Sequence, residues 1–181
     1  AAGVIPLSVG GDHSITLPIL KALGRDRPLG MVRIDAHCDT SGGFDQTKFH
    51  HGGPFRNAVL DGVLDPTRTI QIGIRGGAEY LWEFSYVSGM TVIHAEEVTR
   101  IGIPKVIKRV HEVVGDGPTY ISFDIDSLDP AFAPGTGTPE IGGLSVIQGL
   151  EIVRGCKGLD LVGCDLVEVS PPYDPLGNTA L

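Results

Sequence analysis

Aspartate and histidine side chains recur at short, regular spacing in two parts of this 181-residue sequence. Carboxylates and imidazoles are side chains that bind divalent metal ions. The segment 35–39 carries three of them at alternate positions, and 124–126 carries two. Residues two apart in extended backbone lie on one face, so each segment is predicted to point its ligands in one direction. The six candidate metal ligands are His13, Asp35, His37, Asp39, Asp124 and Asp126.

The chemistry expected of this set is hydrolysis at a pair of divalent cations. Six side chains are too many for one tetrahedral ion, and four carboxylates balance the charge of two dications. Without cations, the carboxylates would raise one another's pKa. An oxygen-rich set without cysteine favours Mn²⁺ or Mg²⁺ over structural zinc, and a bound cation lowers the pKa of water towards neutrality. We therefore expect a metal-dependent hydrolase.

The elements that must position these residues alternate between strand and helix, as in βαβ units around a parallel sheet. Strands are predicted over 4–9, 29–34, 69–74, 91–93, 120–123 and 159–169. Helices are predicted over 14–23, 54–63, 96–114 and 145–154, with Gly102 and Pro104 indicating a break in the third. The candidate ligands follow three of the strands, and open parallel sheets bind ligands outside the carboxyl ends of their strands. We expect one α/β domain with the ligands at a single sheet edge.

Composition argues against several other classes of protein. The net charge of −8 makes nucleic acid an unfavourable partner. Three cysteines without a CxxC pair argue against a disulfide framework and favour the cytoplasm. No apolar run approaches the roughly 20 residues of a membrane span, and no signal peptide is visible. The abrupt ends of the sequence predict a single domain over 1–181 that is incomplete at both ends.

Longer motifs surround the candidate ligands and extend over essentially the whole chain. They are Gly10–Ser14, Asp35–Thr40, Ser122–Pro130, Ala133–Glu140 and Asp165–Asp174. These motifs resemble those of the ureohydrolases, the family of arginase and agmatinase, and the segment Phe49–Arg56 is most similar to agmatinases. The resemblance implies the family fold, a three-layer α/β/α sandwich with a central parallel sheet, with terminal elements missing from this chain.

The resemblance also implies how the ligands divide between two manganese ions, with nickel as an alternative. Asp35 and Asp124 would bridge the two ions. The first ion would be held by His13, Asp35, Asp39 and Asp124. The second would be held by Asp35, His37, Asp124 and Asp126.

The implied reaction is hydrolysis of a linear amidine, in which a guanidino group is cleaved to urea and an amine. Glu168 would bind the small cationic substrate by pairing with its guanidinium in bidentate geometry. Asp126 would accept a hydrogen bond from the attacking water, and His51 would shuttle a proton to the departing amine. Thr138 would hydrogen-bond near the substrate. Family members usually assemble as homo-trimers or homo-hexamers.

Agmatine, which would yield putrescine for polyamine biosynthesis, is the expected substrate. A guanidino acid, as in guanidinobutyrase or guanidinopropionase, is the alternative. Asp45 or Glu79 would suit the second cation of agmatine, whereas Lys48 or Arg75 would suit the carboxylate of an acid. The segment around Trp82 could bind a substrate tail, although packing in the core is favoured there.

Two further readings belong to other classes. A catalytically inactive ureohydrolase-like subunit or fragment would not need an intact site, yet His51 and Glu168 accompany all six ligands. Zinc deacetylases on a similar scaffold are more remote, because they lack the paired aspartates at 124–126 with a downstream Glu168. The neighbouring Asp12, Asp129 and Asp165 are expected to support the ligands or to order loops rather than to bind metal, and Cys38 is expected to pack.

Overall fold

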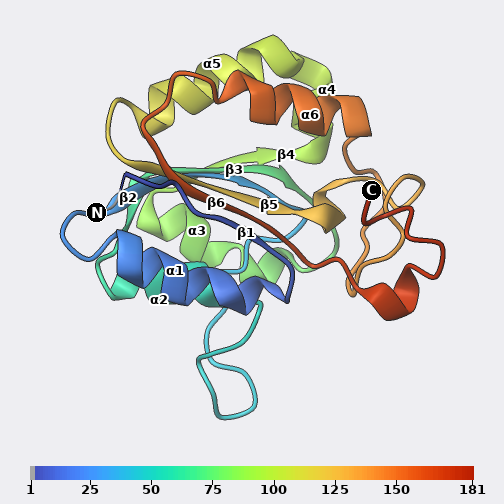
Figure 1. Ribbon diagram of the computed structural model, residues 1–181, viewed down its shortest axis with the longest axis horizontal. Helices are drawn as coiled ribbons and strands as arrows, with labels where there is room; N and C mark the ends of the chain where they lie inside the picture. Colours follow the sequence, from blue (N-terminus) through green and yellow to red (C-terminus); the bar gives the residue numbers. More distant parts are fainter. Residues whose placement is uncertain (1–2) are drawn as a thin grey trace.

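A six-stranded parallel sheet forms the centre of the fold (Figure 1). The structure is a computed structural model that describes residues 3–181. Across the sheet the strands run in the order β1-β6-β5-β2-β3-β4, and each neighbouring pair is parallel. The strands are β1 (Leu7–Val9), β2 (Leu29–Ile34), β3 (Leu64–Ile74), β4 (Thr91–His94), β5 (Thr119–Asp124) and β6 (Leu161–Val167).

Helices cover both faces of the sheet and complete three α/β/α layers (Figure 1). One face carries α1 (Thr16–Leu23), α2 (Pro54–Leu60) and α3 (Glu83–Ser88). The other carries α4 (Ala95–Ile101), α5 (Ile103–Val114) and α6 (Val146–Gly155). Alternate residues of β2 reach opposite layers, since Met31 packs in the cluster with α1 and α2, and Val32 in the cluster with α4, α5 and α6. The predicted three-layer fold is confirmed.

The predicted elements are present, but several ends differ. β2 coincides with its predicted range, whereas β3 begins at Leu64 rather than Thr69. The helix predicted over 96–114 divides at Gly102, whose φ of +82° lies in the left-handed region that favours glycine. Helix α3 was not predicted, because six residues are too few to show helical periodicity.

The sheet order brings four strand ends together at one edge. Because β1, β6, β5 and β2 are successive neighbours and parallel, the loops after them emerge side by side. These loops carry the candidate ligands and Glu168, so the predicted placement at a single edge is confirmed. Within residues 3–181, no helix is both long and apolar enough to cross a membrane.

Candidate metal centre

His13 begins a short 3₁₀ helix, His13–Ile15, in the loop after β1. Gly10 and Gly11 precede it with φ of +100° and +77°, which glycine adopts without steric cost. The side chain of Asp12 caps the 3₁₀ helix by accepting a hydrogen bond from the backbone N–H of Ser14 at 2.9 Å. This turn buries the His13 ring at the edge of the sheet.

The His13 ring presents one nitrogen to carboxylates and the other to a hydroxyl. Nδ1 lies 2.9 Å from Oδ2 of Asp39, 3.0 Å from Oδ2 of Asp124 and 3.2 Å from Oδ2 of Asp35. Nε2 lies 2.7 Å from Oγ of Ser122. Although buried, Nδ1 has no hydrogen-bond partner within residues 3–181. A buried imidazole nitrogen that faces three carboxylate oxygens at 2.9 to 3.2 Å suits a metal ligand.

Asp165 fixes the tautomer of His13 through Ser122. The hydroxyl of Ser122 donates to Oδ1 of Asp165 at 2.7 Å, so its oxygen is left to accept the N–H of His13 Nε2. Oδ2 of Asp165 accepts hydrogen bonds from Thr16 Oγ1 at 2.6 Å and from the Tyr120 hydroxyl at 2.9 Å. With its proton on Nε2, the neutral imidazole keeps the lone pair of Nδ1 free for a metal ion.

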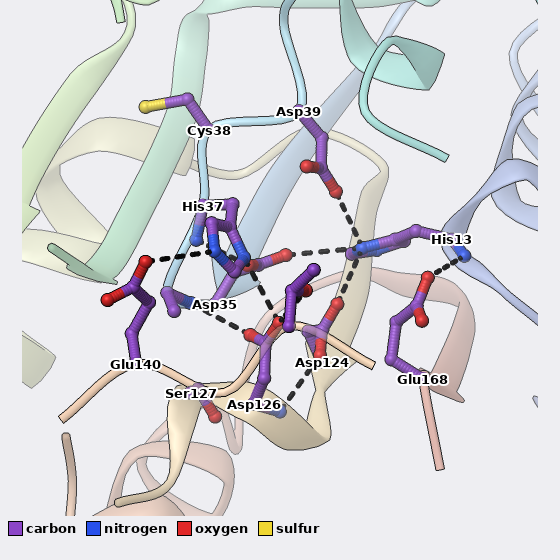
Figure 2. Close-up of polar contacts among 12 residues, drawn as sticks. His13, Asp35, His37, Cys38, Asp39, Asp124, Asp126, Ser127, Glu140 and Glu168 are labelled. Atoms are coloured by element: carbon purple, nitrogen blue, oxygen red, sulfur yellow. Dashed lines mark hydrogen bonds and ion pairs between the residues drawn. The ribbon is translucent and has the colours of Figure 1, made fainter. Parts of the chain in front are cut away.

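The loop after β2 is bent, so the prediction of an extended segment with its ligands on one face is wrong. The backbone N–H of His37 donates to Oδ1 of Asp35 at 2.6 Å, and Asp39 has a φ of +45°. This local hydrogen bond competes with extended backbone. The bend turns Asp35 and Asp39 towards His13 and turns His37 towards Asp126 (Figure 2).

The loop after β5 is not extended either. Asp124 ends the strand, and Asp126 lies in the 3₁₀ helix Ile125–Ser127. The backbone N–H of Asp126 donates to Oδ1 of Asp124 at 2.9 Å. Oδ2 of Asp126 nevertheless reaches the cluster, 3.0 Å from Nδ1 of His37. Because β2 and β5 are paired, the two loops lie side by side.

All six candidate ligands come together in two overlapping groups (Figure 2). Within each group, one ligand atom per residue lies within 4.8 Å of every other. Asp35 belongs to both groups, as predicted for a bridging carboxylate. Asp124, the other residue predicted to bridge, belongs only to the first group, and its Oδ1 accepts the backbone N–H of Asp126. The first group is His13, Asp35, Asp39 and Asp124, and the second is Asp35, His37 and Asp126.

The carboxylates of the cluster are not balanced by its imidazoles alone. Burial and the neighbouring carboxylates of Asp35 and Asp126 raise the pKa of Asp124, and burial and Asp35 raise the pKa of Asp126. Burial by itself would lower the pKa of His37, but Asp126 and Asp35 outweigh it and raise that pKa to about 9. Divalent cations would stabilise the ionised carboxylates. Oxygen and imidazole donors of this kind fit two Mn²⁺ ions.

Two charged residues of the cluster were missed by the sequence analysis. Arg33, on β2, is fully buried and pairs with Asp35 and, at 2.8 Å, with Asp39. Burial opposes ionisation of Asp35, but the Arg33 guanidinium, His13 and His37 together outweigh it and hold the pKa of Asp35 well below its usual range. Glu140 lies 3.9 Å from Nε2 of His37. Neither residue follows the alternate spacing of the candidate ligands. The one sequence signal for Arg33 was a charged residue within an otherwise apolar predicted strand.

A cavity of about 460 Å³ opens onto the cluster, and its wall includes Glu168, His51 and Thr138. Oε1 of Glu168 accepts the backbone N–H of His13 at 2.7 Å and lies 3.9 Å from Nδ1 of His51. Burial raises the pKa of Glu168, which has a φ of +68° just beyond β6. Thr138 Oγ1 donates to Oδ2 of Asp126 at 3.4 Å. The structure therefore brings the three expected substrate residues to the cluster.

The wall of the cavity away from the cluster is largely apolar and aromatic. It includes Phe44, Tyr80, Leu81 and Trp82. Trp82 also packs against His94, with ring centroids 4.8 Å apart. Arg75 is buried and donates to backbone carbonyls, among them that of Asp126 at 2.7 Å. In the described part of the chain, the cavity wall contains none of the four charged residues expected to select the substrate tail: Asp45, Glu79, Lys48 and Arg75.

Asp129 orders a loop and Cys38 packs, as expected. Asp129 accepts backbone hydrogen bonds from Ala131, Gly142 and Gly143 at 2.8 to 3.0 Å. Cys38 is buried, and its side chain points away from the ligands in Figure 2.

Comparison with known proteins shows extensive similarity over the chain. Guanidinopropionase from Pseudomonas aeruginosa is 58% identical and mitochondrial agmatinase from Gallus gallus is 54% identical, each over 100% of this chain. The chain covers 58% and 54% of these two proteins, so it spans little more than half the length of the curated relatives it matches. The structure of proclavaminate amidino hydrolase from Streptomyces clavuligerus has a TM-score of 0.90 at 43% identity, covering 96% of this chain and 58% of that one.

A profile of the arginase family matches residues 1–181. The match includes every motif that carried the resemblance in the sequence. The chain belongs to the arginase family, the ureohydrolases.

Proposed function

We propose that the full-length protein is a binuclear manganese hydrolase that cleaves the guanidino group of a linear substrate to urea and an amine. The two overlapping ligand groups beside a cavity that contains Glu168 and His51 carry this proposal. Membership of the arginase family supports the reaction. The names of the relatives, guanidinopropionase and agmatinase, support a small guanidino compound as the substrate.

The residues around the cavity divide the chemistry between them. Two bound dications, Mn²⁺ or alternatively Ni²⁺, would lower the pKa of water and supply a nucleophile near neutral pH. Glu168 would hold the guanidinium by two parallel hydrogen bonds and so orient its carbon towards the cluster. Asp126, whose Oδ2 accepts a hydrogen bond from Thr138, would accept a hydrogen bond from the attacking water and orient it.

His51 would serve the departing amine. Loss of guanidinium resonance gives a tetrahedral carbon that can expel an amine only if the nitrogen is protonated. The His51 side chain is 55% exposed and lies 3.9 Å from Glu168, so it can exchange protons with solvent beside the bound guanidinium. An imidazole can both accept and donate a proton, so it is suited to deliver that proton.

Agmatine and a guanidino acid are the two candidate substrates. The similarity to agmatinase supports agmatine, and the similarity to guanidinopropionase supports 3-guanidinopropionate. In the described chain, the cavity wall contains no Lys or Arg, and its only Asp and Glu residues are cluster ligands and Glu168. The described residues therefore favour neither a cationic nor an anionic tail, and a substrate panel is needed to choose.

The test is urea release by manganese-loaded full-length protein from agmatine, 3-guanidinopropionate, 4-guanidinobutyrate and arginine. We expect activity with one of the first three, and we expect Asp124→Asn to lose bound manganese and activity together. Asp160→Asn is the matched control, because Asp160 is exposed at the opposite end of β6. Urea release by metal-free protein, or a fully active Asp124→Asn variant, would contradict the proposal.

The same experiment tests the alternative of an inactive subunit. A full-length protein that binds two manganese ions and releases no urea from any substrate of the panel would support that alternative. Trimeric or hexameric assembly and a cytoplasmic location stay predictions, which light scattering of the full-length protein and cell fractionation can check.

A further inference from the structure

Arg33 places a permanent positive charge beside the first group of candidate ligands. Its side chain is completely buried between β2 and α2, with Cζ 4.3 Å from the centre of the Phe55 ring. One guanidinium nitrogen, Nη1, donates to the backbone carbonyl of Cys38. A second, Nη2, pairs with Asp35 and lies 2.8 Å from Asp39. A buried arginine is normally neutralised by carboxylates, and these two are its ion-pair partners in residues 3–181.

The oxygen atoms that bind Arg33 are the same atoms that face His13. Oδ2 of Asp35 and Oδ2 of Asp39 contact Nη2 of Arg33, and they also lie 3.2 and 2.9 Å from Nδ1 of His13. A metal ion held by the first group would therefore draw on oxygens that already carry a cationic partner. Two cations that share the same carboxylate oxygens repel each other, and burial leaves that repulsion poorly screened.

We propose that Arg33 is an internal counter-cation, which holds Asp35 and Asp39 in place before metal arrives and limits the affinity of the first group for its metal ion. This inference rests on the proposed metal function of the cluster. Removal of the Arg33 charge is therefore expected to lower the stability of the metal-free protein and to raise its affinity for metal. Without the charge of Arg33, the metal-free protein loses stability because its carboxylates repel one another, yet a divalent cation binds more tightly because a competitor has gone.

The experiment compares full-length wild-type protein with Arg33→Met, Arg33→Gln and Arg33→Lys after removal of metal by a chelator. Electron paramagnetic resonance of free Mn²⁺ gives the Kd at each site, and thermal denaturation gives the Tm of the metal-free form. For Arg33→Met and Arg33→Gln we expect a lower metal-free Tm and a Kd at one site at least about tenfold lower, within the usual range of coupling between two sites. Arg33→Lys keeps the charge and should resemble wild type in Kd.

Arg68→Met is the matched control for loss of an arginine. Arg68 donates to backbone carbonyls of Val114 and Pro118 near the start of β5, away from the cluster. The Arg68→Met variant should have a lower Tm but the same Kd for Mn²⁺ at each of the two sites. Arg33→Gln retains hydrogen-bond donors, so it supplies the result if Arg33→Met does not fold.

The outcomes separate this inference from the proposed function. Unchanged or weaker Mn²⁺ binding by the uncharged Arg33 variants would overturn the inference, because an arginine with a purely structural role would lower stability and affinity together. Two bound Mn²⁺ ions in wild type would then leave the proposed function standing. A wild-type protein that binds no Mn²⁺ would overturn both.

Discussion

The hydrogen bond between His13 and Ser122 gives the sharpest test of the metal centre. Ser122→Ala removes the oxygen that accepts the N–H of His13 Nε2 and that donates to Oδ1 of Asp165, each at 2.7 Å. The His13 ring then loses the partner that fixes its tautomer, and Asp165 loses one of its three hydroxyl donors. Both groups are buried, so no bulk water replaces the lost contacts.

The size of the effect follows from these two contacts. Loss of a hydrogen-bond partner of a metal-binding histidine weakens metal affinity by about 10- to 100-fold, or about 1.4 to 2.8 kcal/mol. Leaving a buried donor and a buried carboxylate oxygen unsatisfied should lower the free energy of unfolding of the metal-free protein by about 2 to 4 kcal/mol. Competition with a Mn²⁺ chelator measures the first quantity, and denaturant unfolding measures the second.

Ser127→Ala is the matched control. Ser127 is also buried beside the cluster, but its Oγ has no hydrogen-bond partner in the described chain. Loss of a buried hydroxyl that has no partner should not lower the free energy of unfolding, because an unsatisfied buried polar group is itself unfavourable, and it should leave metal affinity unchanged. Wild-type affinity in Ser122→Ala, or an equal loss in Ser127→Ala, would refute the assignment of Nδ1 as the ligand atom.

Three further predictions address substrate, proton transfer and pH. Glu168→Gln should lower kcat/KM by about 10- to 150-fold, because a hydrogen bond to a charged group contributes about 1.5 to 3 kcal/mol, and it should keep its bound manganese. Urea kinetics and metal analysis measure these two quantities, and an unchanged kcat/KM would contradict the prediction. His51→Asn should lower kcat by about 10²- to 10⁴-fold, and added imidazole should restore part of the activity. The Tm should not change, because the His51 ring is half exposed. An unchanged kcat would exclude His51 as the proton donor. In metal-free protein the pKa of His37 is raised to about 9, so its stabilising contribution is complete below its unfolded value of about 6.5 and is lost as pH rises through about 9. Over the same window Mn²⁺ affinity should rise, because the metal displaces that proton; a pH-independent Kd measured by chelator competition would contradict this.

The sequence was sufficient to predict the sheet and the edge that carries the site. Continuous apolar runs identified the parallel strands, and the placement of polar residues after strand ends predicted that the six candidate ligands lie together. The local geometry was not predictable in the same way. The alternate spacing of Asp35, His37 and Asp39 suggested extended backbone, but a side-chain hydrogen bond to the N–H of His37 bends the loop. The candidate ligands converge because the strands that precede them are adjacent, and not because the ligands share one face of a strand.

Residues that act through long-range contacts were harder to find. Ser122 and Asp165 are separated by 43 positions in sequence, and no pattern within one strand reveals that they share a hydrogen bond. Charged residues in variable loops were expected to select the substrate tail. One of them, Arg75, is instead buried and donates hydrogen bonds to backbone carbonyls. Charge type in a sequence does not show whether a side chain faces solvent, a cavity or the protein's own backbone.

The backbone conformation of Asp39 and Glu168 has a consequence for engineering. Both are non-glycine residues in the left-handed region, with φ of +45° and +68°. Such a conformation costs an L-amino acid on the order of 1 kcal/mol that glycine would not incur. Glycine would relieve this strain, but it would also remove the carboxylate of Asp39 that pairs with buried Arg33 and the carboxylate of Glu168 that accepts the backbone N–H of His13. A screen for more stable variants should therefore measure activity as well as stability at these two positions.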